Sequence, residues 1–195
     1  MKTVLEDKPM IIEEWNDIRA PEPPELKKIT VDAKTTALLI LDIQNQNCNR
    51  ERRPRCVKSV SKIKFLLQKA RQSGIPIIYS LTRSATEKDI LPEVEPQKNE
   101  PIVKSGVNKF YKTDLEFILS SRNISKVIIV GTSAHGAVLN TATGAAQRRL
   151  EVIVPVDGLS ASDPYAEQYT VWHLANSPGT RRSVILTKFE WIKIA

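Results

Sequence analysis

The segment that decides the fold of this chain is Val127-Ile-Ile-Val-Gly-Thr-Ser-Ala-His-Gly-Ala-Val-Leu-Asn-Thr-Ala142. Its first four residues are apolar and β-branched without alternation, which predicts a strand covered on both faces of a parallel sheet. Gly131 ends that strand, and small and apolar residues then recur at helical spacing over 137–149. Unpaired N–H groups and the helix dipole favour negative charge at such a helix start. A nucleophile or an anion site is expected here, yet the side chain in place is the methyl group of Ala137.

Strand-like and helix-like segments alternate along the rest of the chain. Strands are expected over 36–44, 75–80, 102–103, 152–157 and 183–187, and further helices over 57–72, 114–122 and 164–176. This alternation implies right-handed crossovers between parallel strands. The predicted fold is α/β, a three-layer α/β/α domain over 34–195 with a mainly parallel, Rossmann-like twisted sheet. Residues 1–33 are expected to form an N-terminal arm with little regular structure beyond a short turn near 13–18.

Composition narrows the class of protein. The chain has 195 residues, a mass of 21.9 kDa and a net charge of +7. It contains no apolar run of about 18 residues, which argues against a membrane span. Its first residues lack the apolar core of a signal peptide, which predicts a cytoplasmic protein. The basic run 50–55 carries no interleaved aromatic residues and is interpreted as a solvated loop, so a small anionic substrate is favoured over nucleic acid.

Cys48 and Cys56 lie close together in one loop. In a cytoplasmic protein, two such cysteines are expected to be free thiols and not a disulfide. Without histidines nearby they do not form a zinc site. A reactive thiol at Cys48 stays open as an alternative, because reactivity depends on a lowered pKa.

Polar residues follow the expected strands where a site would form. Asp42 ends the strand at 36–44, Lys104 follows the strand at 102–103, and Ala137 lies in the turn after 127–130. The carboxyl ends of parallel strands gather functional groups at one edge of a sheet. A buried aspartate is costly unless it is paired. We therefore expect Asp42 to be a functional residue at this edge, with Lys104 and the turn at Ala137 aligned beside it, although Asp42 capping the following loop is an alternative.

These segments, in this order, resemble the isochorismatase-like hydrolase superfamily. The resemblance is carried by 38–44, 103–115, 130–142 and 154–158. Most members of that superfamily are cysteine hydrolases with an Asp, Lys and Cys triad. The resemblance places the Asp at Asp42, the Lys at Lys104 and the Cys at Ala137, so the nucleophile is missing and covalent catalysis is disfavoured.

One branch of the superfamily, the isochorismatases proper, also lacks the cysteine and hydrolyses a vinyl ether to release pyruvate. Ala134-His135 and Ala137 resemble the pattern of that branch. The resulting hypothesis makes Asp42 the general acid for hydrolysis by water. Lys104 would pair with Asp42 and with a substrate carboxylate, and N–H groups of 133–137 would line an anion site.

The resemblance also suggests what the site contains. Substrate contacts are expected from Gln44, Phe110, Ser133, Ala134, His135 and Gly136. Neither a metal nor a cofactor is expected, because the two histidines of the chain, His135 and His173, do not follow Asp42 as those of the nicotinamidases would. The resemblance further implies a homo-oligomer, a dimer or a tetramer.

Three other readings stay open at this stage. The chain could be a catalytically silent binding or scaffold member of the family, since fold does not imply function. It would be an amidohydrolase if Ala137 replaced a natural cysteine. A nucleophile at Ser133 or Cys48 with His135 as the base is a third alternative.

Overall fold

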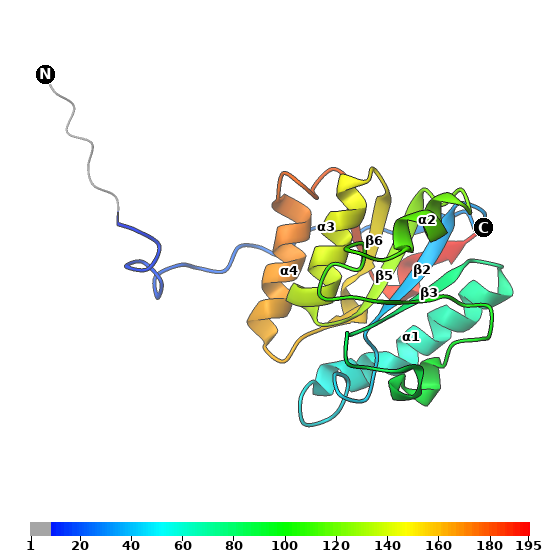
Figure 1. The fold of residues 1–195 in the computed structure, drawn as a ribbon. Coiled ribbons are helices and arrows are strands. Elements are labelled where there is room, and N and C mark those ends of the chain that lie inside the picture. The colour runs from blue at the N-terminus through cyan, green and yellow to red at the C-terminus, as the bar shows by residue number, and fades with distance from the viewer. Residues whose placement is uncertain (1–8) are drawn as a thin grey trace, which may run out of the picture.

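A parallel sheet forms the centre of the molecule (Figure 1). The computed structural model describes residues 9–195, and within them the main sheet has seven strands. Six strands run in the order β4-β3-β2-β5-β6-β8, and β7 pairs with the end of β5. Every pair is parallel. The strands are β2 (Thr36–Leu41), β3 (Ile77–Leu81), β4 (Ile102–Lys104), β5 (Lys126–Thr132), β6 (Glu151–Pro155), β7 (Leu159–Ser160) and β8 (Val184–Thr187).

Helices cover both faces of this sheet, which confirms the predicted α/β/α class. They are α1 (Pro54–Gln72), α2 (Leu115–Ser120), α3 (Leu139–Gln147) and α4 (Pro164–Asn176). Along β2, Leu39 and Leu41 face the cluster that α2, α3 and α4 complete. Leu38 and Ile40 face the opposite cluster, to which α1 contributes. Both faces of the central strand are therefore buried, as its uninterrupted apolar sequence predicts.

The ends of the chain add a small second sheet that the sequence analysis did not predict. β1 (Ile29–Val31) lies parallel to β9 (Ile192–Ile194). The expected arm without regular structure is therefore wrong at its carboxyl end, because a three-residue strand has too short a pattern to be seen. The turn expected near 13–18 is represented by hydrogen-bonded turns, one with Asp17 N donating to Glu14 O at 2.9 Å. Figure 1 shows this part of the arm extending away from the body.

Gly131 has a backbone conformation in which a side chain would clash with the neighbouring strand. It lies opposite Leu41 in the register of β2 and β5, and its φ is +130°. A Cβ at this position would lie 2.1 Å from the carbonyl oxygen of Leu41. Only glycine fits that approach, and it sets the turn after β5 beside Asp42, whose own φ is +53°.

Within residues 9–195, none of the helices combines the length and the apolarity needed to cross a membrane. The longest of them, α1, is amphipathic, with buried Val60, Ile63 and Leu67 against the sheet. Pro54 occupies its first turn, where a missing N–H is tolerated, so the helix begins three residues before the expected start at 57.

Candidate active site

A cavity of about 640 Å³ opens at the carboxyl edge of the sheet. Asp42 enters it from the end of β2 and Ala137 from the turn after β5, so two of the three expected site positions do meet. The other lining residues come from the loops after β2, β3 and β4 and from the end of β5; they are Asn47, Arg52, Arg53, Thr82, Arg83, Ser105, Gly106, Val107, Asn108, Tyr111, Thr132 and Ser133.

Asp42 is a buried carboxylate with two strong partners. Its side chain accepts a hydrogen bond from Ser80 Oγ at Oδ1 and one from Lys109 Nζ at Oδ2, each at 2.8 Å. Burial raises the pKa of Asp42 above its ordinary value of 3.8, while the positive charge of Lys109 and the two hydrogen bonds oppose the rise. A carboxyl group held in this way retains its proton to higher pH than an exposed one, which suits a proton donor.

The lysine that pairs with Asp42 is Lys109, so the prediction of Lys104 is wrong. Lys104 ends β4 with its side chain exposed, because the alternation of the strand turns Val103 inward and Lys104 outward. Lys109 lies in the following loop and is fully buried. Its backbone N–H donates to Thr141 Oγ1 of α3 at 3.2 Å. Burial lowers the pKa of Lys109, and the charge of Asp42 opposes that shift.

The sequence pattern does not identify Lys109 as the partner of Asp42. Lys104 and Lys109 both belong to the polar stretch 103–115, and the choice between them depends on how the loop after β4 folds back under the sheet edge. The available signal was the strand alternation itself, which already directs Lys104 to the opposite side from its buried neighbour Val103.

The turn after β5 is built from small residues. A cis peptide bond joins Thr132 to Ser133, and a π-helical turn then covers Ala134–Val138. The N–H groups of Gly136 and Val138 both donate to the carbonyl oxygen of Ser133 at 3.1 Å. A Cβ on Gly136 would lie 2.4 Å from Ser133 Oγ, so a larger residue there would displace the Ser133 side chain. Ser133 and Ala137 face the cavity from this turn, as expected.

The structure does not bring five of the expected substrate contacts to the cavity: Gln44, Phe110, Ala134, His135 and Gly136 do not line it. Ala134 and Phe110 are buried in the core, and the Arg148 guanidinium stacks on the Phe110 ring at 4.5 Å. His135 is exposed on the outer side of the turn. Gln44 is buried and donates to Thr82 Oγ1 at 2.9 Å. Successive side chains of a turn or loop point to different sides of the chain, so neighbours in sequence can lie on opposite sides of the cavity wall.

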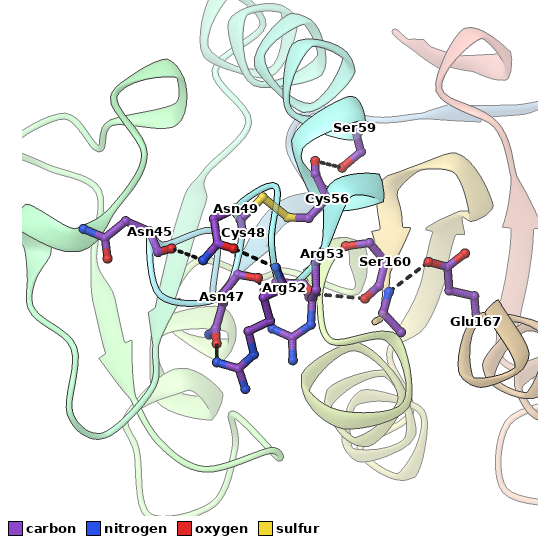
Figure 2. The surroundings of a disulfide bond; sticks show 12 residues. Asn45, Asn47, Cys48, Asn49, Arg52, Arg53, Cys56, Ser59, Ser160 and Glu167 are labelled. Carbon is purple, nitrogen blue, oxygen red and sulfur yellow. Dashed lines mark hydrogen bonds between the residues drawn. A yellow bond between two sulfur atoms is a disulfide. The ribbon is translucent and has the colours of Figure 1, made fainter. Parts of the chain in front are cut away.

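Cys48 and Cys56 form a disulfide, so the prediction of free thiols is wrong (Figure 2). Their Cα atoms lie 5.3 Å apart, and both residues are buried. Cys56 lies in the first turn of α1, which curls the preceding loop back onto Cys48. The close spacing of two cysteines in one loop is the sequence signal for this bond.

This disulfide closes the loop that brings Arg52 and Arg53 to the cavity. The sequence pattern did not identify these two arginines as site residues. Arg53 is only 8% exposed, and Arg52 and Arg83 also line the cavity. Arg55 turns away and pairs with Glu167 of α4 at 2.5 Å. The basic run at 50–55 is therefore not a uniformly solvated loop.

Metal-binding side chains do not cluster in the part of the chain that the structure describes: no three of His, Cys, Asp or Glu come together there. The cavity instead offers one carboxyl group, a buried lysine behind it, and guanidinium groups. This set is suited to binding an anion and moving a proton.

Comparisons with known proteins agree with this class of fold. Residues 36–184 match the isochorismatase domain family, and the chain therefore belongs to that family. One relative is the secreted isochorismatase effector Isc1 of Verticillium dahliae, which is 28% identical over 146 residues, 69% of this chain and 77% of that protein.

Solved structures share the fold at low sequence identity. An isochorismatase from Pseudomonas putida superposes with a TM-score of 0.73 at 18% identity, covering 85% of this chain and 94% of that one. An N-carbamoylsarcosine amidase from Thermoplasma acidophilum gives a TM-score of 0.69 at 21% identity, covering 80% and 97% of the two chains. These two structural neighbours carry the names of two different chemistries.

Proposed function

We propose that this protein hydrolyses a small anionic vinyl ether, with Asp42 as the proton donor and water as the nucleophile. Isochorismate is the first substrate to test, since two of the relatives above are named isochorismatases. The observation that carries the proposal is that two groups line the same cavity, a buried carboxyl with a raised pKa at Asp42 and a methyl group at Ala137.

The absence of a thiol separates this reaction from amide hydrolysis. The chain contains two cysteines, and both are in the disulfide between Cys48 and Cys56. At position 137, where the superfamily resemblance expects the nucleophile, alanine cannot form a covalent intermediate. Neither a thioester nor an acyl-enzyme on sulfur is available, so the route of the cysteine amidohydrolases is disfavoured.

The proposed chemistry needs one proton and one water molecule. Asp42 gives its proton to the terminal alkene carbon of the vinyl ether, which leaves a positive charge shared by the adjacent carbon and the ether oxygen. Water attacks that carbon and returns a proton to the Asp42 carboxylate. The hydroxyl proton of the hemiketal then passes to the ether oxygen as the bond between that oxygen and the carbon breaks, which releases an alcohol and, from isochorismate, pyruvate. Lys109 stabilises the carboxylate that exists between the two proton transfers.

The test is pyruvate release from isochorismate by the wild-type protein and by Asp42→Asn. We expect the variant to lose roughly 10²–10⁴-fold in kcat/KM, the usual contribution of a positioned acid. Asp114→Asn is the matched control, because Asp114 is exposed and makes no side-chain cap hydrogen bond at α2. Retention of activity in Asp42→Asn would rule out this mechanism.

A panel with nicotinamide and N-carbamoylsarcosine tests the alternative chemistries in the same assay. Under the proposal, wild-type protein leaves both amides intact while it consumes isochorismate. A protein inactive on every member of the panel would instead be a silent binding or scaffold member of the family.

The homo-oligomer, the anionic small-molecule partner and the cytoplasmic location remain predictions. The disulfide removes one argument for the cytoplasm, since such bonds persist in oxidising compartments.

A further inference from the structure

Arg53 is a buried cation with unused hydrogen-bonding capacity beside Asp42. It is 8% exposed, and its Nη1 donates to the Asn47 carbonyl oxygen at 3.2 Å. Its Nε is buried without a hydrogen-bond partner in residues 9–195. No carboxylate of that range lies within ion-pair distance of its guanidinium. Buried charged groups are normally paired, so this one is prepared for a partner that binds from the cavity.

The nearest carboxyl group does not supply that partner. Both oxygens of Asp42 are taken, one by Lys109 and one by Ser80. Burial and the neighbouring charge of Arg52 lower the pKa of Arg53, and the charge of Asp42 opposes this shift. An added anion in the cavity would relieve both the desolvation and the repulsion between the two arginines.

Other arginines of the same loop have different surroundings. Arg55 is paired with Glu167, and Arg50 is exposed and does not line the cavity. Arg52 is exposed at the cavity and donates to Gln46 O at 3.0 Å and Asn47 Oδ1 at 3.2 Å. Arg53 is the member of this run that combines burial, an unpartnered Nε and a place in the cavity lining.

The disulfide fixes the loop that carries Arg53. Cys48 and Cys56 enclose it, and Cys56 N donates to Arg53 O at 2.9 Å. Asn49 Oδ1 accepts from Arg52 N at 2.8 Å. Figure 2 shows the Arg52 and Arg53 side chains leaving the loop on the side away from the sulfur bridge. A side chain held by its loop in this way loses little freedom on binding.

We propose that Arg53 is a specificity-determining residue that binds a carboxylate of the substrate through the Nε edge of its guanidinium. This edge presents two parallel N–H donors, which match the two oxygens of a carboxylate. The identity of the substrate rests on the function proposed above, whereas carboxylate binding at Arg53 does not require turnover. Arg53 would select substrates that carry an acid group at a fixed distance from the bond that Asp42 protonates.

Affinity for isochorismate in an Asp42→Asn background provides the first test, since catalysis is removed there. Calorimetry should show that adding Arg53→Met weakens binding about 30-fold or more, as truncation of one partner of a buried charge pair does. Arg50→Met removes the same charge from the same loop and should change the affinity less than about twofold. Equal weakening by both substitutions, or no weakening by Arg53→Met, would overturn the proposal. If Arg53→Met does not fold, Arg53→Lys replaces it, and its affinity should fall because one rigid pair of donors is lost.

The Nε–H signal of Arg53 in a ¹⁵N NMR spectrum gives a second test that is independent of isochorismate. The signal is assigned by its loss in Arg53→Lys, and pyruvate is the carboxylate probe. A saturable shift of the Arg53 signal is expected in wild-type protein, with the Arg50 signal as the control. If this shift occurs in a protein that does not hydrolyse isochorismate, the proposed function fails and the carboxylate site stands. If no saturable shift occurs, the carboxylate site is wrong, whatever the activity.

Discussion

The two walls of the cavity differ in both chemistry and construction. The charged wall consists of Asp42, Arg52 and Arg53 from the end of β2 and the loop after it. The small-residue wall consists of Thr132, Ser133 and Ala137 from the end of β5 and the turn after it. Both begin at the carboxyl ends of neighbouring parallel strands, so the same topology supports two different kinds of surface. The ionisable groups of the two walls all belong to the charged wall. The small-residue wall leaves space for substrate and water.

Different forces hold the two walls in place. The small-residue wall depends on close packing, since a Cβ on Gly131 would lie 2.1 Å from Leu41 O and one on Gly136 2.4 Å from Ser133 Oγ. The charged wall depends on pairing and on a covalent bond, through Lys109 behind Asp42 and the disulfide behind Arg53. A reaction that needs a proton donor and a water molecule requires one wall to carry the ionisable group and the other wall to leave space for water.

Lys109→Met should have the largest effect on the charged wall. Breaking a buried ion pair by removing one partner costs about 3–5 kcal/mol of unfolding free energy. Loss of the lysine also raises the pKa of Asp42 further, because the opposing positive charge is gone. Urea denaturation and a pH profile of kcat/KM measure the two effects.

Lys104→Met is the control for this prediction. Its side chain is exposed at the end of β4, so the substitution should change stability by less than about 0.5 kcal/mol. If the two substitutions were equally mild, Lys109 would not be the residue that holds Asp42. If Lys104→Met were the more damaging, the assignment from sequence would be restored.

Removing the disulfide with Cys48→Ser and Cys56→Ser should have the next largest effect. Loop-closure entropy for a loop of about nine residues predicts a loss of roughly 2.5 kcal/mol. The variant should also bind isochorismate more weakly, because Arg53 would lose its fixed position. A reductant should lower the stability of the wild-type protein and leave the variant unchanged. Equal affinities of the two proteins would show that the loop holds Arg53 without the sulfur bridge.

Sequence patterns predicted the packed wall better than the charged one. The apolar strands, Gly131 and the place of Ala137 in the same cavity as Asp42 follow from local pattern and from the rule that functional groups gather at strand ends. Lys109, Arg53 and the disulfide depend on how three loops fold against one another. Loop conformation is set by tertiary contacts such as the one between Lys109 N and Thr141 Oγ1, which no periodicity records. The β1–β9 pair was missed for a related reason, since it joins opposite ends of the chain.

The pH dependence of stability and activity should follow the raised pKa of Asp42. Between 3.8 and that raised pKa, the native protein binds more protons than the unfolded chain. Stability should therefore fall as pH rises through this window, by at most about 1.4 kcal/mol per pH unit. The kcat/KM for isochorismate should fall with it, because the proton donor is lost. Thermal melts and rates should be measured across this pH window. The fall of stability and the fall of kcat/KM with rising pH should both disappear in Asp42→Asn and persist in Asp114→Asn.

Ala137→Cys should have the smallest effect, and it addresses the small-residue wall directly. The substitution adds a single sulfur atom to the wall, and the proton donor stays at Asp42, so isochorismate hydrolysis should fall less than about tenfold, or about 1.4 kcal/mol in the barrier. The double variant with Asp42→Asn should be inactive. A new amidase activity in Ala137→Cys alone would mean that the two walls still hold a nucleophile and its partners in register, and that the residue at 137 separates the two chemistries. Vinyl ether hydrolysis could instead fall as far in Ala137→Cys as in Asp42→Asn. The methyl group at 137 would then take a direct part in the reaction. The small-residue wall would no longer serve only to make room for substrate and water.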